Sequence, residues 1–562
     1  MDFKRYLNFL PAILILNFFL IVYSIVKINE ETLFCFYALV LIINLLLIVI
    51  SLCFGYKNII SSFKKIKKST WIILIIILLF GFYLRMFVAP HSHHIFFDED
   101  IYLNMAQNIV NEGKSCLCNY GNTKNCFNCI SNKQPHGLPA FYAVFFFLFG
   151  VSETVAVNVS IAIAVFSILL VFLISYILFK KEKLSVYSAF VFTLLPVHIR
   201  WSATQALGPL LVFFSLLTIL LFLIYLEKRN MFILFAFFCT LAYTCQIRPE
   251  SMLMAVVAAS FFIFMDKGIF KTVRDRKFLI AFALFLILIL PTVEHTNNMK
   301  YEDWGASGNK FSKDIIKKNL ADNSKFFVEN TRFPLIFTIF SIIGVIFGLY
   351  KYPRKIVSFT IWFLLFFAIF IPFYAGSFNY GKDVRFSLNL YPSIAIFSGL
   401  GFYLLNLILL NVLKKFKFNQ KKQIFKLSIH TLIIVLIFLS FIPFVELVSN
   451  YGEKGWDAKA AHDFAVSEAP NIKNCIVISK VPSMFLVNGV PAIQIFLVPN
   501  KEMMITLHKE YGCVMFYEEY WCVNSLIDRE GICSDFKKDY NLKTYKSSET
   551  RDKTYTFYTV EK

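Results

Sequence analysis

The sequence predicts a mainly α-helical membrane protein of about 13 transmembrane helices, followed by a small soluble α/β domain. Its 562 residues are 58% hydrophobic and only 16% charged, whereas about 25% of the residues in soluble domains are charged. Apolar stretches of about 20 residues, enough to cross ~30 Å of hydrocarbon, recur as far as residue 449. The polar segment that follows alternates strand and helix patterns instead. A wholly water-soluble protein is therefore excluded.

Thirteen apolar stretches are long enough to be spans: 8–27, 33–55, 70–90, 153–179, 184–200, 206–226, 230–247, 250–265, 277–294, 334–350, 356–374, 386–411 and 427–449. A further stretch, 137–151, is short. If it crossed, Lys180 and Lys181 would lie on the side opposite to the other basic runs. We therefore expect it to enter the membrane without crossing, or to lie against other helices.

The charges decide which way the chain is threaded. The formal net charge is +20, and the basic residues fall mainly in short runs between spans. This is the pattern of cytoplasmic loops rather than of a nucleic-acid surface, so no nucleic-acid partner is expected. We expect a multi-pass protein of the cell membrane with a cytoplasmic N-terminus. The outer side then holds loops 91–136, 295–333 and 375–385, and the segment 450–562.

Three parts are expected along the chain. Residues 1–69 hold two helices and a basic cytoplasmic loop, residues 70–449 hold the main membrane domain, and residues 450–562 form the outer α/β domain. The expected strands of this last part are 475–478, 492–496, 514–517 and 554–560, and its expected helices are 482–487 and 501–511.

Eight of the twelve cysteines fall on the expected outer side, in two even sets: Cys116, Cys118, Cys126 and Cys129, and then Cys475, Cys513, Cys522 and Cys533. Even sets in an oxidising compartment favour disulfides. The first set, spaced C-x-C-x7-C-x2-C, fits a structural zinc held by four thiolates as the less favoured alternative.

An acidic cluster, Asp98-Glu99-Asp100, lies at a membrane boundary between Phe97 and Ile101. Carboxylates there are costly unless they are bound or paired. Capping of the helix that follows explains one acid, and Asp100 fits that role best, but it explains three adjacent acids poorly. The cluster therefore predicts a functional site.

A cationic set faces this cluster, at or near the outer ends of different helices: Arg85, Arg200, Arg248 and Arg385, with Lys382 close to the last. One arginine there need only extend its head group to the interface. Four on one side fit a phosphate-bearing lipid, because guanidinium groups bind phosphate oxygens bidentately. The long segment 294–333 is either a lid or acceptor-binding loop, or a partly ordered excursion.

Phe97-Asp98-Glu99-x-x-Tyr102 and the segment 134–142 resemble the first outer loop of C-type glycosyltransferases (the GT-C fold) that use polyprenyl-phosphate sugars. The resemblance is to the family that includes protein O-mannosyltransferases and the lipid A aminoarabinose transferase. Leu195-Pro196-x-His198 and the segment 385–392 resemble later landmarks. The chain departs from the family in its Pro135-His136-Gly137-Leu138-Pro139 segment, its two additional N-terminal helices and its cysteine-rich insertion.

The resemblance implies a GT-C fold over about 70–450 and transfer of a sugar, with inversion, from a polyprenyl- or dolichyl-phosphate donor to a protein, lipid or glycan acceptor. It implies Asp98, and after it Glu99, as the general base. The residues implied to bind the donor phosphate are Arg385, Lys382, Arg248, Arg200 and Arg85. Those implied to bind substrate are Tyr102, His136, Tyr142 and His198.

A divalent metal ion, Mg²⁺, Mn²⁺ or Zn²⁺, held by Asp98, Glu99, His93 and His94 would supply similar charge. The alternative for these histidines is a plain polar stretch. No nucleotide-binding loop is visible, so we expect no nucleotide cofactor. Two other functions stay open: a lipid or polysaccharide transporter or flippase, which usually has charges near the bilayer midplane, and an oligosaccharyltransferase of the same fold.

Overall fold

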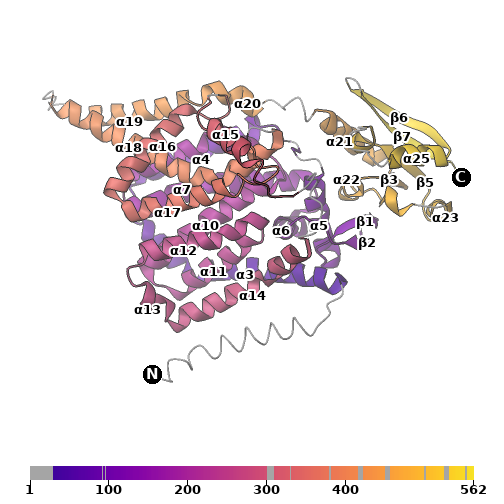
Figure 1. Cartoon of the computed structure of the whole chain (residues 1–562), viewed down its shortest axis with the longest axis horizontal. Helices are drawn as coiled ribbons and strands as arrows, with labels where there is room; N and C mark the ends of the chain where they lie inside the picture. Colours follow the sequence, from indigo (N-terminus) through magenta and orange to yellow (C-terminus); the bar gives the residue numbers. More distant parts are fainter. Residues whose placement is uncertain are drawn as a thin grey trace.

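The computed structural model describes residues 30–91, 93–94, 97–299, 309–329, 331–378, 381–415, 422–449, 456–498, 501–523, 531–550 and 553–561. The expected span 8–27 lies outside these ranges. A large helical bundle fills one side of the molecule, and a smaller domain built on a β-sheet is attached to one end of it (Figure 1).

Helices occupy all twelve of the expected spans that the structure describes. They are α3 (Glu30–Phe63), α4 (Lys68–Tyr83) continued by η1 (Leu84–Val88), α7 (Glu153–Phe179), α8 (Glu182–Thr193) with α9 (Pro196–Ser202), α10 (Leu207–Lys228), α11 (Met231–Cys245), η2 (Pro249–Met252) with α12 (Leu253–Met265), α14 (Arg276–Asn298), α16 (Leu335–Lys351), α17 (Pro353–Ala368), α18 (Tyr391–Lys415) and α19 (Lys422–Leu439). In the described ranges, seven helices are long and apolar enough to cross a membrane, or eight if the bent pair α8–α9 is one span. The expected number of about 13 spans therefore stays a prediction.

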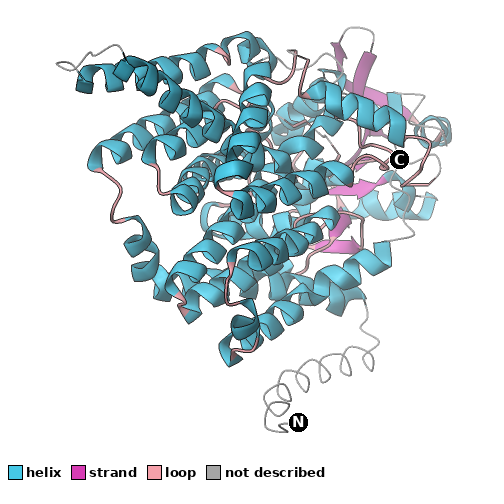
Figure 2. Ribbon diagram, turned by 60° about the vertical axis from the view of Figure 1, so that its left-hand side comes forward, coloured by secondary structure: helices cyan, strands magenta, loops and turns pink. Residues whose placement is uncertain are grey.

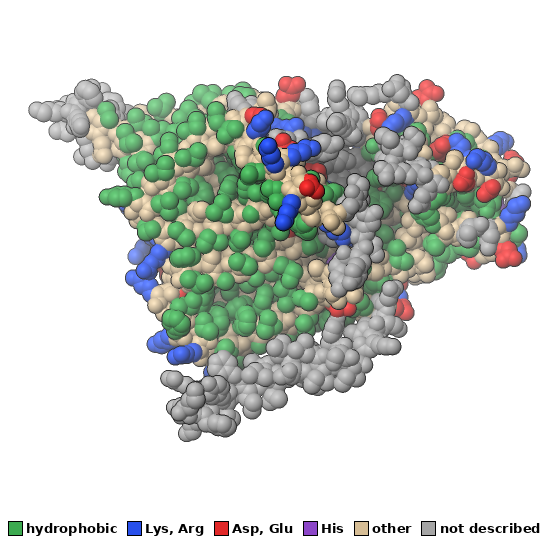
Figure 3. Space-filling view, in the orientation of Figure 1, with side chains coloured by type: hydrophobic (Ala, Val, Ile, Leu, Met, Phe, Trp, Pro, Cys, Tyr) green, Lys and Arg blue, Asp and Glu red, His purple; other side chains and the backbone are tan. Residues whose placement is uncertain are grey.

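The surface of the bundle is that of an integral membrane protein. Hydrophobic side chains cover its flank, and charged side chains gather toward its ends and on the sheet domain (Figure 3). Large apolar side chains such as Leu79, Ile346 and Phe149 are more than 60% exposed. A surface of this kind is stable in lipid and would aggregate in water.

Close backbone contacts hold the helices of the bundle together. A Cβ atom at Gly344 of α16 would lie 1.8 Å from the carbonyl oxygen of Phe397, and one at Gly401 of α18 would lie 2.1 Å from that of Phe340. Only glycine permits this approach, as at many helix contacts in membranes.

Helix α6 (Gly137–Phe149) corresponds to the short apolar stretch. Its 13 residues span about 20 Å, less than the ~30 Å hydrocarbon core, in agreement with a segment that does not cross. Its start is fixed to the end of α11, because the Gly137 amide donates to the Gln246 carbonyl at 3.2 Å and the Tyr243 hydroxyl donates to the Gly137 carbonyl at 2.6 Å.

The sheet of the C-terminal domain has seven strands in the order β2-β1-β4-β3-β5-β7-β6. Its parallel centre consists of β3 (Cys475–Ser479), β4 (Ala492–Gln494) and β5 (Cys513–Glu518), with β7 (Lys553–Val560) and β6 (Leu542–Thr550) antiparallel at one side. Its helices are α21 (Trp456–Glu468), α22 (Pro482–Val487), α23 (Lys501–Glu510), α24 (Tyr520–Val523) and α25 (Ile532–Asp539). The four expected strands and two expected helices are present.

The other side of the sheet comes from the first loop. Strands β1 (Leu117–Gly121) and β2 (Cys126–Ile130) form a hairpin, and β1 pairs with β4 through Tyr120 and Gly121. The strands therefore form one group beside the bundle (Figure 2). The segment 450–562 alone does not complete its own sheet.

All eight cysteines on this side form disulfides: Cys116–Cys129, Cys118–Cys126, Cys475–Cys513 and Cys522–Cys533. Cys118–Cys126 joins β1 to β2, and Cys116–Cys129 joins the residue before β1 to β2. The prediction of disulfides is confirmed, and the alternative of a zinc site with four thiolates is wrong, since these sulfur atoms are bonded to one another.

Candidate functional site

The first turn of α5 (Asp98–Glu112) presents its three acids in three directions. Acidic side chains are favoured at a helix N-terminus, where the helix dipole is positive. The N-cap residue is Phe97, and no side chain caps the helix. The expectation that Asp100 is only a cap is therefore wrong, and its partners are described below.

Asp98 is held from two sides. The Gln134 side-chain amide donates to Asp98 Oδ1 at 2.7 Å, and its own oxygen accepts from the Tyr102 hydroxyl at 2.8 Å. The Arg385 guanidinium lies 3.8 Å from Asp98 Oδ2, and both side chains stay about one-fifth exposed. The carboxylate is thus oriented by its neighbours and still open to a substrate.

A cavity of about 660 Å³ opens beside this carboxylate. Its polar lining includes Asp98, Tyr102, Gln134, Arg248 and Arg385, and its apolar lining includes Leu207, Phe311, Phe370, Phe373 and Tyr374. A largely apolar cavity with a few convergent polar groups is typical of a ligand site.

Two arginines line this cavity with their guanidinium groups against one ring. The Cζ atoms of Arg248 and Arg385 lie 4.8 Å and 5.1 Å from the centre of the Phe386 ring. Cation–π contacts of this kind orient a guanidinium without neutralising it. Arg248 also pairs with Glu250, Nε to Oε1 at 2.7 Å. Arg385 lies on η4 (Gly381–Leu390), which precedes α18.

Two of the expected site residues form a pair inside the bundle instead. The fully buried Arg85 donates to the Gly81 carbonyl at 2.9 Å and lies 3.0 Å from His198 Nδ1. Neither side chain lines the cavity. Arg85 and His198 therefore contact each other within the bundle, apart from the cavity, and their expected roles in phosphate and substrate binding stay untested predictions.

Two more expected residues, Arg200 and Tyr142, also lie apart from the cavity lining. Arg200 is at the end of α9 and does not line it, and the side chain of Lys382 lies outside the described part of the chain. The Tyr142 hydroxyl is buried 2.8 Å from Ser160 Oγ, so Tyr142 joins α6 to α7. Its expected contact with a substrate stays an untested prediction.

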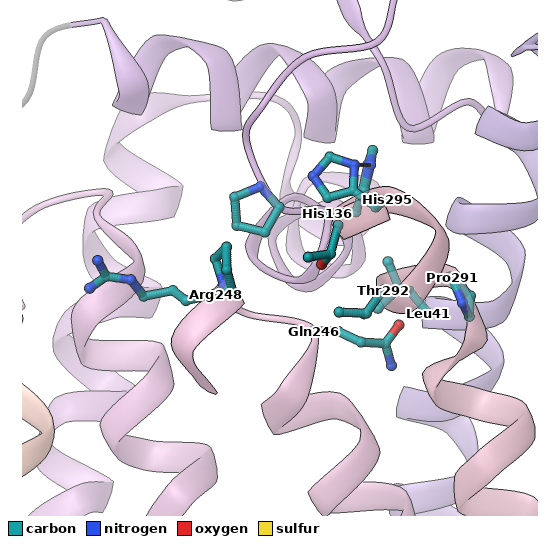
Figure 4. A pocket seen from close by; sticks show the side chains of 10 residues that line it. Leu41, His136, Gln246, Arg248, Pro291, Thr292 and His295 are labelled. Atoms are coloured by element: carbon teal, nitrogen blue, oxygen red, sulfur yellow. Dashed lines mark hydrogen bonds between the residues drawn. The ribbon is translucent and has the colours of Figure 1, made fainter. Parts of the chain in front are cut away.

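His136 stands directly behind the cavity. Its Nε2 lies 3.2 Å from His295 Nδ1, and its Nδ1 lies 2.8 Å from Ser115 Oγ. Figure 4 shows this imidazole pair in a small pocket, with Arg248 extending away from it. His295 and Arg248 line both the small pocket and the large cavity. His136 therefore supports the cavity wall and does not line the cavity itself.

Part of the long segment before α16 closes one side of the cavity. Phe311 pairs with Phe373 in a β-bridge, and Lys310 and Phe311 line the cavity. On α15 (Ile316–Phe326), Asn319 donates to the carbonyls of Phe370 and Phe373 at 3.3 Å and 2.8 Å. The described part thus packs as a wall. The Trp304–Gly308 portion lies outside the described ranges.

In the described part of the chain, the expected metal set, Asp98, Glu99, His93 and His94, does not converge as one group, although Glu99 and His93 bring ligand atoms near each other, 3.7 Å apart. Glu99 is fully buried and accepts from the backbone amides of His94 at 3.0 Å and Gln205 at 3.3 Å, while Asp98 faces the cavity. Within the described ranges, one group of side chains does converge in a way that fits a metal ion: His93, Asp100, Glu153 and His462.

The carboxylates of this group act on both imidazoles. Burial lowers the pKa of His93 and so does His462, but Asp100 and Glu153 outweigh them, and the net shift is upward. Burial also lowers the pKa of His462, yet Asp100, Asp463 and Glu153 raise it well above its usual range. The group is thus a tightly coupled set of two acids and two bases.

Sequence reasoning missed four residues of these two sites. Gln134 lies inside the segment 134–142 that resembles the family, and Glu250 follows Arg248 by two positions, so both carry a local signal. Glu153 and His462 carry no local sequence signal. They come together only because folding brings the start of α7 next to α21.

Comparisons with known proteins agree with this architecture. A family model described as dolichyl-phosphate-mannose-protein mannosyltransferase matches residues 133–295, a range that includes Gln134 and Arg248. A comparison with curated proteins finds no match.

Solved structures resemble the chain over most of its length. The oligosaccharyltransferase AglB from Archaeoglobus fulgidus, in complex with an inhibitory peptide and a dolichol-phosphate, is 14% identical, with a TM-score of 0.52 over 86% of this chain and 73% of that one. ArnT from Cupriavidus metallidurans bound to undecaprenyl phosphate is 10% identical, with a TM-score of 0.59 over 88% of this chain and 98% of that one. The chain therefore has the GT-C fold, as the sequence predicts.

Proposed function

We propose that this protein is a membrane glycosyltransferase that moves a sugar from a polyprenyl-phosphate-linked donor to an acceptor hydroxyl. The observation that carries the proposal is one cavity that joins an oriented carboxylate, Asp98, to two arginines, Arg248 and Arg385, beside an apolar wall. Each feature matches one part of the substrate pair: the acceptor proton, the donor phosphate and the donor lipid.

The donor phosphate binds at Arg385 and Arg248. As the bond between the anomeric carbon and the phosphate oxygen breaks, negative charge grows on the leaving phosphate. Two fixed guanidinium groups stabilise that charge more than they stabilise the ground state, which is the condition for catalysis. The apolar side chains, among them Phe370 and Phe373, border the start of the lipid chain.

Asp98 is the general base of the transfer. It takes the proton from the acceptor hydroxyl, whose oxygen forms a bond to the anomeric carbon while the lipid phosphate leaves from the opposite side, so the configuration inverts. Gln134 and Tyr102 orient the carboxylate. Glu99, the second candidate for this role, does not fit it. Both of its carboxylate oxygens accept hydrogen bonds from backbone amides.

The end of the molecule that holds the cavity beside Asp98 faces the outer side of the membrane. All four disulfides lie on that side of the molecule, and disulfides persist in oxidising compartments. The basic runs between spans favour a cytoplasmic location for the opposite end of the bundle. We expect the N-terminus on that same side. The structures of AglB in complex with a dolichol-phosphate and of ArnT bound to undecaprenyl phosphate support a lipid phosphate as the donor.

A second candidate is an oligosaccharyltransferase, favoured by the likeness to AglB. The two functions differ in what is transferred. Incubation with a polyprenyl-phosphate monosaccharide and with a lipid-linked oligosaccharide, followed by mass spectrometry of the products, separates them. A product from the monosaccharide donor alone supports our proposal, and movement of the intact donor across the bilayer without a product supports a flippase.

The direct test is Asp98→Asn in the full chain, assayed with a radiolabelled polyprenyl-phosphate sugar. We expect turnover to fall by roughly 10²- to 10⁴-fold, the usual contribution of a general base, with an unchanged melting temperature. Asp314→Asn, an exposed acid of the nearby loop, serves as the matched control and should keep full turnover. Near-normal turnover of Asp98→Asn would remove Asp98 as the base.

A further inference from the structure

We propose that His93, Asp100, Glu153 and His462 bind a divalent transition-metal ion, best matched by Zn²⁺, and that this ion ties the C-terminal domain to the helical bundle. This proposal is independent of the proposed sugar transfer. Asp98, Arg248 and Arg385 belong to the cavity, whereas these four residues lie on the other side of the first turn of α5.

The spacing of the four side chains fits one small ion. His93 Nε2 lies 3.3 Å from Glu153 Oε2, and His462 Nε2 lies 3.5 Å from both Asp100 Oδ1 and Glu153 Oε1. Four ligands about 2.0–2.1 Å from a tetrahedral Zn²⁺ are about 3.3–3.4 Å from one another. One ligand atom from each residue lies within 4.8 Å of all the others, so small side-chain movements close the tetrahedron.

The donor set also selects the class of metal. Two imidazole nitrogens favour zinc and its transition-metal neighbours over Mg²⁺ and Ca²⁺, which prefer oxygen ligands alone. Two carboxylates neutralise the charge of a divalent ion. His93, Asp100 and His462 are buried, and four protein ligands leave no open position, which is typical of structural rather than catalytic zinc.

The surrounding side chains orient the ligands. His93 Nδ1 lies 3.7 Å from Glu99 Oε2 and 3.8 Å from Asp100 Oδ1. His462 Nδ1 likewise lies 3.9 Å from Asp463 Oδ1. Zinc-bound histidines usually donate a hydrogen bond from the second ring nitrogen to a carboxylate, and both histidines have a carboxylate near that nitrogen, beyond hydrogen-bond distance in this structure. The Asn488 amide donates to Glu153 Oε1 at 3.2 Å and so fixes the fourth ligand.

The ligands come from parts of the chain that must meet when the protein folds. His93 and Asp100 belong to the first loop and α5, Glu153 begins α7, and His462 lies on α21 of the C-terminal domain. The same contact surface includes the Gln107 amide, which donates to the Leu486 carbonyl at 3.0 Å. A metal ion here would therefore stabilise the docking of the sheet domain on the bundle.

The rival explanation is a metal-free cluster of two imidazolium groups and two carboxylates. To separate the two, the full chain purified in detergent is loaded with excess Zn²⁺, desalted, and its zinc content measured by inductively coupled plasma mass spectrometry. We expect one Zn²⁺ per chain, and a lower melting temperature after chelation that Zn²⁺ restores. Wild-type protein that retains no zinc after desalting overturns the proposal.

Two variants assign the site. His462→Ala and Asp100→Asn should each weaken zinc binding at least tenfold in competition with a chromophoric chelator. His508→Ala, a histidine of α23 outside the group, should bind zinc as the wild type does. Undiminished zinc affinity in both site variants overturns the assignment.

A measurement on the wild type covers the case in which these variants fail to fold. Co²⁺ in place of Zn²⁺ should give the visible absorption of a tetrahedral ion, and an octahedral spectrum overturns the proposed ligand set. Failure of these zinc experiments would leave the proposed sugar transfer standing, since that is tested by turnover of the Asp98 variant.

Discussion

Two acids of one helical turn, Asp98 and Asp100, face opposite kinds of surroundings. Asp98 faces an open cavity, where an amide holds it and an arginine stands 3.8 Å away. Asp100 is buried against two imidazoles, His93 at 3.8 Å and His462 at 3.5 Å. One acid is oriented but left accessible, and the other is enclosed.

The difference lies in the partner as well as in exposure. An arginine stays protonated and attracts anionic substrate groups, so a cavity lined by Arg248 and Arg385 is suited to a phosphate. An imidazole can be a metal ligand, so the enclosed side is suited to a metal ion or a fixed ion-pair network. Sequence proximity therefore does not make the three acids one site.

The largest effect on binding is expected at the cavity arginine. Arg385→Ala should weaken donor affinity by about 10- to 150-fold, since hydrogen bonds to charged groups contribute about 1.5–3 kcal/mol. Titration with a fluorescent polyprenyl-phosphate analogue measures this. Arg85→Ala, which removes the buried arginine paired with His198, should instead lower the melting temperature and leave donor affinity of the folded protein unchanged. The reverse result would move the phosphate site into the bundle.

A smaller effect is expected from the amide that orients Asp98. Gln134→Leu removes the donor to Asp98 Oδ1, so kcat should fall about tenfold, in line with the ~1.5 kcal/mol of a hydrogen bond to a charged group. Gln134→Glu, which puts a second carboxylate beside the first, should reduce kcat further. Unchanged kcat in both variants would mean that catalysis by Asp98 does not depend on the hydrogen bond from Gln134.

The smallest effect is expected one step further from the carboxylate. Tyr102→Phe removes the hydroxyl that donates to Gln134, and the loss of one neutral hydrogen bond, about 0.5–1.5 kcal/mol, should lower kcat by about two- to tenfold. The double variant Tyr102→Phe with Gln134→Leu should be no slower than Gln134→Leu alone, since both act through the same amide. Additive losses would show that Tyr102 acts independently.

Much of the architecture follows from the sequence alone. The lengths of the apolar stretches predicted the helices. The short stretch before α7 forms a helix, α6, that is shorter than a membrane span, as expected. Strand patterns located β3 and β5, whose residues are nearly all apolar. Strand β6 was missed because its run, Leu-Lys-Thr-Tyr-Lys-Ser-Ser-Glu-Thr, has too few apolar residues to give a strand signal.

The candidate sites were less accessible from the sequence because their residues meet only through tertiary structure. Arg248 and Arg385 were identified by their position at helix ends, but Arg85 had the same position and turned out to pair inside the bundle. His462 and Glu153 gave no local signal. The β1–β2 hairpin joins the distant C-terminal sheet, a contact that no local pattern predicts.

The most direct test compares the two acids in the same two measurements, sugar turnover and bound zinc. We predict that Asp98→Asn loses roughly 10²- to 10⁴-fold in turnover and keeps one zinc per chain, whereas Asp100→Asn loses the zinc. Wild-type turnover in Asp98→Asn would contradict the central claim that the cavity beside Asp98 is a sugar-transfer site with this carboxylate as its base.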